Sequence, residues 1–178
     1  MKVGFYAGSF DPFTKGHLQV VKTASALFDA VVVGICVNPN KTRKHDRRQM
    51  ANAINKLFKN EKLNNVKCIT YDGLTVDSAK EYGADFLIRG LRNSSDYIFE
   101  EGLANINSEI SGLDTIFIRA GSYGAVSSSM VNELLRNGRD VSAYVPNEIL
   151  PILKKKKTHN NDISNGKSIE ICSMLLFF

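Results

Sequence analysis

The chain has 178 residues, of which 43% are hydrophobic and 23% charged, a balance typical of a soluble globular domain with a sizeable core. Its net charge of +5 and pI near 9.1 favour an anionic partner, whether a nucleic acid, a membrane surface or a small phosphorylated ligand. No segment is apolar enough over a sufficient length to span a bilayer, and no secretory signal opens the chain, so we expect a cytoplasmic protein.

Short apolar runs alternate with helix-period segments along the whole chain. The predicted strands are Lys2–Ala7, Ala30–Val37, Val66–Tyr71, Phe86–Arg89 and Thr115–Arg119. The predicted helices are His17–Phe28, Asp46–Phe58, Thr75–Tyr82, Asp96–Glu109 and Ser128–Asn137, with a last one near Asn147–Lys156. Continuously apolar strands joined by helices predict an α/β, Rossmann-like fold: a doubly wound parallel five-stranded sheet with helices on both faces.

Local signals support several helix boundaries. Asp46 is placed to cap the second helix, and Ser127 or Ser128 to cap the fifth. Gly138 suits the end of that fifth helix, because glycine readily adopts the left-handed conformation found there. Pro146 suits the start of the last helix.

The pattern favours one folded domain over residues 1–157. From residue 158 the periodicity is lost, so we expect residues 158–178 to be a disordered or appended tail. The three cysteines share no metal-ligand spacing, and two of them, Cys36 and Cys68, lie in apolar runs where reduced, buried thiols are expected.

Polar residues and glycines follow each of the five predicted strands. These segments are Gly8–His17, Asn38–Lys41, Asp72–Thr75, Arg89–Arg92 and Gly121–Ser129. Because the carboxyl ends of parallel strands meet at one edge of the sheet, we expect their basic groups, hydroxyls and glycines to converge there. Such an edge suits a phosphate-rich ligand.

The first of these segments, Gly8–His17, is the most informative. Its glycines let backbone N–H groups approach a ligand at the start of a helix, where phosphate is favoured, and Thr14 and His17 add side chains that form hydrogen bonds. Dinucleotide, P-loop and hydrolase-elbow glycine motifs are all missing from the sequence. The three histidines are too scattered for a metal site, so we expect no protein-held metal.

Three motifs together resemble bacterial phosphopantetheine adenylyltransferases, a family of the nucleotidylyltransferase superfamily that carries a T/H-x-G-H motif. They are Gly8–His17, Ile88–Arg92 and Ser127–Ser129. The first and third mark the superfamily, and Ile88–Arg92 points to the pantetheine branch. The resemblance extends from Lys2 to Leu153.

The resemblance implies that the adenylyl group of ATP is transferred to 4′-phosphopantetheine, giving dephospho-coenzyme A and pyrophosphate by direct in-line displacement at the α-phosphorus. It also implies Mg²⁺ bound mainly to ATP oxygens and assembly as a homohexamer. Neither nucleic acid nor a membrane is then expected as a partner.

The same resemblance assigns roles to individual residues. His17 is expected to stabilise the transition state, with Lys41 and Arg92 as further catalytic residues. The phosphopantetheine side is expected to use Ser9, Lys41, Thr75 and Arg89. The ATP side is expected to use Ser9, Phe10, His17, Gly90, Leu91, Arg92, Glu100, Tyr123, Gly124, Ala125, Val126, Ser127, Ser128 and Ser129.

The sequence departs from the family pattern at His45–Met50, where the family has an aromatic residue, a Ser/Thr cap and a Glu-Arg pair. Thr75 replaces a commonly apolar residue. One alternative is a sister nucleotidylyltransferase acting on nicotinate mononucleotide or glycerol phosphate, against which Ile88–Arg92 argues. A second alternative is a nucleic-acid-binding module without enzymatic activity. The high pI favours it, but the lack of aromatic residues among the basic ones argues against it.

Overall fold

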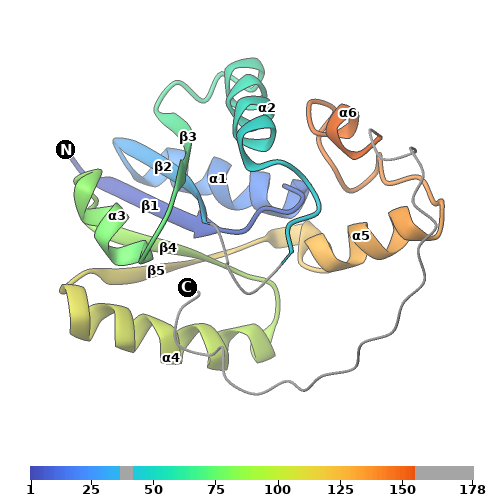
Figure 1. Cartoon of the computed structure of the whole chain (residues 1–178). Coiled ribbons are helices and arrows are strands. Elements are labelled where there is room, and N and C mark those ends of the chain that lie inside the picture. Colours follow the sequence, from blue (N-terminus) through green and yellow to red (C-terminus); the bar gives the residue numbers. More distant parts are fainter. Residues whose placement is uncertain (37–41, 155–178) are drawn as a thin grey trace.

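The computed structural model describes residues 1–36 and 42–154, in which five strands form one parallel sheet. The strands are β1 (Val3–Gly8), β2 (Ala30–Cys36), β3 (Val66–Tyr71), β4 (Phe86–Leu91) and β5 (Asp114–Arg119). Their order in the sheet is β3-β2-β1-β4-β5, so the chain winds outward from β1 to β3 and then crosses to the other side of β1. The switch point therefore lies between β1 and β4, and the predicted doubly wound fold is confirmed (Figure 1).

Helices cover both faces of the sheet (Figure 1). One face is covered by α1 (Lys15–Leu27) and α2 (Arg47–Asn60), and the other by α3 (Thr75–Glu81) and α4 (Ser94–Ser111). Helix α5 (Ser128–Arg136) lies beyond the carboxyl end of β5. Two short elements complete the described chain, the 3₁₀ helix η1 (Gly121–Tyr123) and α6 (Leu150–Leu153). None of the helices in the described ranges combines the length and apolarity that a membrane crossing requires.

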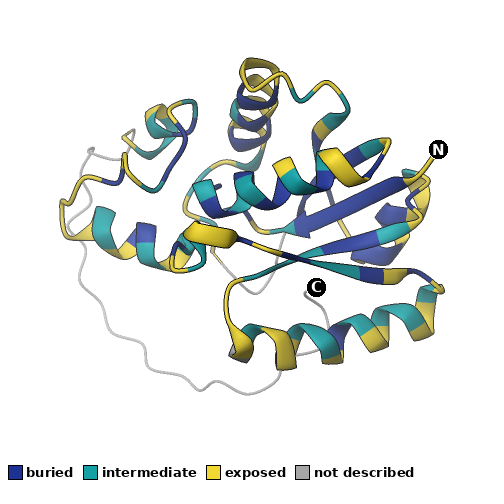
Figure 2. Cartoon of the chain, turned by 180° about the vertical axis from the view of Figure 1, so that it is seen from behind, coloured by how far each residue is buried: buried dark blue, intermediate teal, exposed yellow. Residues whose placement is uncertain are grey.

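The core consists of two apolar layers, one on each face of the sheet. Successive strand residues point to opposite faces, so Tyr6 packs with the layer under α1 and α2, whereas Phe5 packs with the layer under α3. On α1, Leu18, Val21 and Ala24 are buried at helical spacing. Burial on both faces explains why β1 and β2 are continuously apolar, and Figure 2 shows β1 dark blue along most of its length.

The predicted helix caps are present. The Asp46 side chain accepts a hydrogen bond from the Gln49 N–H at 2.8 Å, and Ser127 accepts one from the Met130 N–H at 3.1 Å. Gly138 follows α5 with φ of 68°, the left-handed conformation expected of a helix stop.

Two predicted boundaries are wrong in extent. β4 continues through Gly90 to Leu91 because both pair with β5, so Arg89 lies inside the strand. The last helix was expected over Asn147–Lys156, but α6 covers only Leu150–Leu153, because the preceding residues form a turn closed by the Ile149 N–H on the Pro146 carbonyl.

Candidate active site

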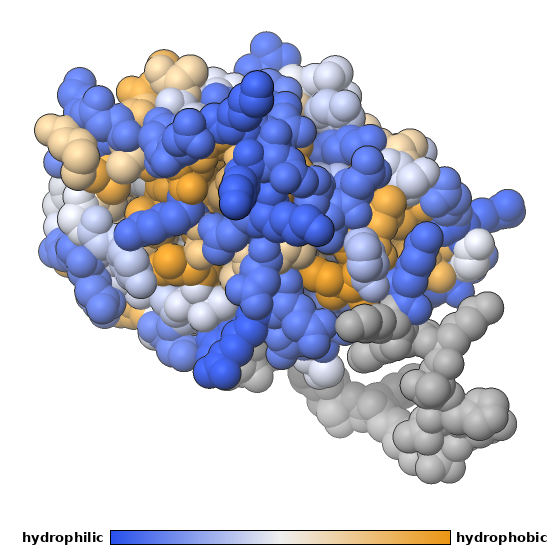
Figure 3. All heavy atoms as spheres, turned by 90° about the horizontal axis from the view of Figure 1, so that it is seen from above, coloured by the Kyte–Doolittle hydropathy of each residue, from blue (hydrophilic) through white to orange (hydrophobic). Residues whose placement is uncertain are grey.

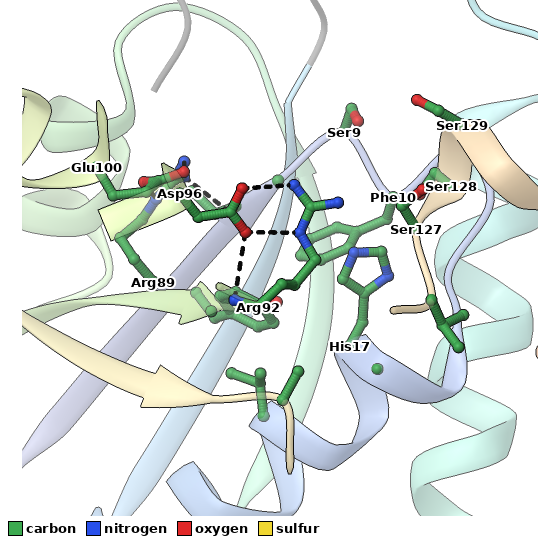
Figure 4. A pocket seen from close by; sticks show the side chains of 18 residues that line it. Ser9, Phe10, His17, Arg89, Arg92, Asp96, Glu100, Ser127, Ser128 and Ser129 are labelled. Carbon is green, nitrogen blue, oxygen red and sulfur yellow. Dashed lines mark hydrogen bonds and ion pairs between the residues drawn. The ribbon is translucent and has the colours of Figure 1, made fainter. Parts of the chain in front are cut away.

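A cavity of about 390 Å³ opens at the carboxyl ends of β1, β4 and β5, beside the first turns of α1 and α5 (Figure 4). This position is the switch point of the sheet, where open α/β sheets bind their ligands. The predicted site residues that line it are Ser9, Phe10, His17, Arg89, Gly90, Arg92, Glu100, Val126, Ser127, Ser128 and Ser129.

His17 is anchored by the start of α1. Thr14 caps the helix, and its hydroxyl accepts a hydrogen bond from the His17 N–H at 3.4 Å. In return, the Nδ1 atom of His17 accepts a hydrogen bond from the Thr14 backbone N–H at 3.0 Å. Because Nδ1 is an acceptor, the neutral ring carries its proton on Nε2, on the opposite side of the imidazole. His17 is therefore available to the cavity as an N–H donor.

The His17 ring is neutral and tightly packed. Burial, assisted by the positive charge of Arg92, lowers its pKa to about 4. The rings of Phe10 and Phe13 lie with their centroids 5.0 Å and 5.4 Å from that of His17. Phe10 itself has φ of 43°, a conformation that a bulky residue rarely adopts and that is typical of functional sites. His17 thus remains an uncharged donor at neutral pH.

Arg92 and Asp96 form a bidentate ion pair at the edge of the cavity, and Figure 4 shows the Arg92 guanidinium close to His17. Arg92 Nε lies 2.7 Å from Asp96 Oδ2 and Nη2 lies 2.9 Å from Oδ1. The Arg92 backbone N–H also donates to Oδ2 at 3.2 Å. Asp96 lines the cavity, but the sequence analysis did not predict it as a site residue. The signal that could have found it is its position four residues after an arginine, a spacing that lets the two side chains pair on a helix.

Arg89 and Glu100 form a second bidentate pair deeper in the cavity. Arg89 Nε lies 2.5 Å from Glu100 Oε2 and Nη2 lies 2.9 Å from Oε1, while Nη1 donates to the Ala7 carbonyl at 3.3 Å. Burial opposes the charge of Arg89, but the Glu100 carboxylate outweighs it and raises the pKa of Arg89. The structure therefore joins two residues that were expected to serve different substrates.

The start of α5 is tied to the turn that follows β1. Ser128 Oγ donates to the Pro12 carbonyl at 2.8 Å, and Asn132 Nδ2 donates to the Asp11 carbonyl at 2.8 Å. These bonds hold the two segments against each other, so Ser9 and the serines of residues 127–129 face the same cavity.

Gly16 permits the close packing of α1 on the loop before α5. A Cβ atom at Gly16 would lie 3.2 Å from the Tyr123 carbonyl oxygen and 3.4 Å from that of Val126. Both neighbours are backbone atoms, so a side chain at this position would force the loop to shift by a few tenths of an ångström.

Comparisons with known proteins identify the family. A family model described as cytidylyltransferase-like matches residues 5–134. The chain is 40% identical over 150 residues to a phosphopantetheine adenylyltransferase of Flavobacterium psychrophilum, covering 84% of this chain and 98% of that protein. It is 39% identical over 158 residues to a protein of the same name from Lachnoclostridium phytofermentans, covering 88% and 96%. The chain belongs to the phosphopantetheine adenylyltransferase family.

A solved structure shows the same fold. The nicotinic acid mononucleotide adenylyltransferase of Plasmodium falciparum, complexed with NaAD, matches with a TM-score of 0.63 at 18% identity, over 86% of this chain and 95% of that one. The family resemblance carried by the three sequence motifs is therefore confirmed, and the fold is shared with a wider group of adenylyltransferases.

The other predicted site residues lie away from the cavity or outside the described chain. Thr75, at the start of α3, is buried with its hydroxyl 2.8 Å from that of Tyr71. Gly124 packs behind Arg92, since a Cβ atom there would lie 3.1 Å from the Arg92 carbonyl oxygen. Lys41 lies outside the described residues. The residues that do not line the cavity are Thr75, Leu91, Tyr123, Gly124 and Ala125.

Proposed function

We propose that the protein transfers the adenylyl group of ATP to 4′-phosphopantetheine, giving dephospho-coenzyme A and pyrophosphate. The observation that carries this proposal is the neutral, helix-anchored Nε2–H donor of His17 next to two guanidinium groups in a cavity at the switch point. Relatives named phosphopantetheine adenylyltransferase, about 40% identical over most of their length, support the same reaction.

In the proposed reaction, an oxygen of the acceptor phosphate attacks the α-phosphorus of ATP in line with the departing pyrophosphate. A new P–O bond forms, the bond between the α-phosphorus and the bridging oxygen breaks, and pyrophosphate leaves with the electron pair. No protein nucleophile is required, so catalysis depends on positioning and on stabilising charge at the α-phosphate. His17 Nε2–H is placed to donate to an α-phosphate oxygen, and it needs no prior protonation.

The two substrates are proposed to occupy opposite sides of the cavity. Arg92 and the serines of residues 127–129 face the ATP phosphates, next to the N-terminal turn of α1. Arg89 serves the acceptor, and Ser9, which lines the same cavity, contacts both substrates. Phosphate oxygens that reach Arg89 and Arg92 have to share or displace their present carboxylate partners.

We propose that Mg²⁺ enters the site as its complex with ATP. Within residues 1–36 and 42–154, no three His, Cys, Asp or Glu side chains gather as a metal site requires. The two carboxylates that line the cavity, Asp96 and Glu100, are each bonded to an arginine. ATP oxygens and water would therefore hold most of the ion, which neutralises polyphosphate charge when bound.

We also propose that α4 forms a contact between subunits of a homohexamer in the cytoplasm, with neither nucleic acid nor a membrane as partner. Figure 2 shows exposed positions along this helix. Its exposed apolar side chains include Tyr97, Ile98, Phe99, Ile106 and Ile110, with Ile98 exposed to 77%. Exposed apolar side chains in this number are typical of surfaces that other subunits cover. Light scattering on the wild type and on Ile98→Glu measures whether the assembly forms and depends on this face.

The acceptor distinguishes the proposal from its closest alternative, because a structural neighbour is named nicotinic acid mononucleotide adenylyltransferase. The test is pyrophosphate release from ATP with 4′-phosphopantetheine, nicotinate mononucleotide or glycerol phosphate as the acceptor. We expect release with 4′-phosphopantetheine alone. Preferential release with either of the others would replace the proposed acceptor.

A further inference from the structure

Arg43 lies between β2 and α2 and is fixed over the carboxyl ends of two strands. Its Nη1 donates to the Ser9 carbonyl at 2.8 Å and to the Cys36 carbonyl at 3.4 Å. Its Nε donates to the His45 carbonyl at 3.2 Å. Three main-chain carbonyls from three segments therefore hold the guanidinium in place.

Unlike Arg89 and Arg92, which line the cavity, Arg43 has no carboxylate within ion-pair distance among residues 1–36 and 42–154. The Asp11 carboxylate is near enough to feel its charge, but it already accepts from the Lys44 N–H at 2.7 Å and from His45 Nδ1 at 2.6 Å. The Nη2 atom of Arg43 is buried and has no hydrogen-bond partner in this part of the chain. A buried cationic donor without an acceptor is costly, so an anion from outside the chain would stabilise it.

Arg43 and Arg89 flank the same end of β1. Arg89 donates to the Ala7 carbonyl and Arg43 to the Ser9 carbonyl, two residues further on, and Ser9 is exposed at the cavity. Both guanidinium groups also act on Cys36, since burial raises the pKa of its thiol while the charges of Arg89 and Arg43 oppose that rise. Both guanidinium groups therefore lie within electrostatic reach of the same thiol at the end of β2.

We propose that Arg43 is a specificity-determining residue that binds the acceptor phosphate together with Arg89. This inference rests on the proposed function. Arg92 follows β4, on the far side of β1 from β2, so ATP phosphates bound at Arg92 leave the β2 side, where Arg43 lies, to the acceptor. In binding, the long 3.4 Å contact of Arg43 with the Cys36 carbonyl is exchanged for shorter, charge-assisted bonds from the guanidinium to phosphate oxygens.

The test compares ligands that differ only in the phosphate. Calorimetry on the full chain measures the Kd of 4′-phosphopantetheine, of pantetheine without the phosphate, and of ATP. Arg43→Gln keeps an amide donor for the Ser9 carbonyl but removes the charge. We expect it to weaken 4′-phosphopantetheine binding by about tenfold, which corresponds to about 1.4 kcal/mol, and to leave pantetheine and ATP binding unchanged. Arg48→Gln, at an exposed position of α2, is the matched control and should bind all three ligands as the wild type does.

Arg43→Lys should recover part of the lost affinity for 4′-phosphopantetheine, because it restores the positive charge but not the paired N–H donors of a guanidinium group. Equal weakening for 4′-phosphopantetheine and pantetheine in Arg43→Gln, or wild-type binding of both, would overturn the inference. If Arg43→Gln does not fold, two other results would overturn the inference. One is wild-type affinity of Arg43→Met for 4′-phosphopantetheine. The other is an equal loss of affinity for 4′-phosphopantetheine and pantetheine in Arg43→Lys. Failure of the wild type to release pyrophosphate with this acceptor would instead overturn the proposed function.

Discussion

Replacing His17 by alanine removes two interactions that the structure assigns to opposite sides of one ring. The first is the Nε2–H donor that faces the cavity, and the second is the Nδ1 acceptor for the Thr14 backbone N–H. Loss of one preorganised donor at a developing charge lowers kcat by roughly 100- to 1000-fold, or about 2.7–4 kcal/mol of activation free energy. Loss of the cap partner lowers the free energy of unfolding by about 1 kcal/mol.

His17→Gln is the matched control. Residue 17 is the third of α1, where glutamine can accept a hydrogen bond from the backbone N–H of the capping residue. With its oxygen turned to Thr14, the amide N–H₂ faces the cavity and replaces the imidazole donor. We expect the glutamine variant to unfold with nearly the wild-type free energy and to have a kcat between those of wild type and alanine variant.

The assay is pyrophosphate release at saturating ATP and 4′-phosphopantetheine, with the free energy of unfolding measured by urea denaturation in parallel. A near-wild-type kcat for His17→Ala would remove the residue from the mechanism. An inactive His17→Gln that folds normally would show that an N–H donor at this position is not what the reaction uses.

Three further predictions concern the ionisable groups of the site. Arg89→Met should raise the KM for 4′-phosphopantetheine by about tenfold in steady-state kinetics and leave the KM for ATP unchanged. A selective loss of ATP binding would mean that the roles of Arg89 and Arg92 are reversed. Glu100→Gln should lower the free energy of unfolding by about 2–4 kcal/mol in urea melts, because it leaves the largely buried Arg89 without its carboxylate; an unchanged midpoint would contradict this. The pKa of His17 is about 4 in the folded chain and near 6.5 in the unfolded chain, so the unfolded chain binds more protons between these two pH values. The free energy of unfolding should therefore fall by up to about 3 kcal/mol as the pH drops from 6.5 to 4. His17→Gln should lack this contribution, and an identical pH dependence in both proteins would refute it.

The features that the sequence predicted well depend on short-range patterns. Thr14 and His17 are three residues apart, and a helix that starts between them brings them together whatever the rest of the chain does. The caps at Asp46 and Ser127 are local in the same way. Alternation of apolar strands with helices fixed the sheet type, and the convergence of strand ends at one edge followed from that.

The pairing of charged groups could not be predicted, because it depends on where α4 lies relative to β4. Arg89 meets Glu100 eleven residues later only because the strand extends to Leu91 and the helix then returns beside it. The predicted strand ended at Arg89, but the pairing of Gly90 with β5 overrides the weak strand preference of glycine. The contacts of Arg43 with three carbonyls are equally non-local.

The direction of the loop before α5 also could not be predicted from the sequence. The close contact of Gly124 with the Arg92 backbone turns this part of the loop behind the site, while the serines after it face the cavity. The sequence of a run of small residues does not show which of them points inward, because that depends on how the loop packs against α1.

The reaction itself is tested most directly by measuring pyrophosphate release from ATP and Mg²⁺ with and without 4′-phosphopantetheine. We expect release that depends on the acceptor and yields stoichiometric dephospho-coenzyme A. Release that is equal with and without 4′-phosphopantetheine, or no release in its presence, would contradict it.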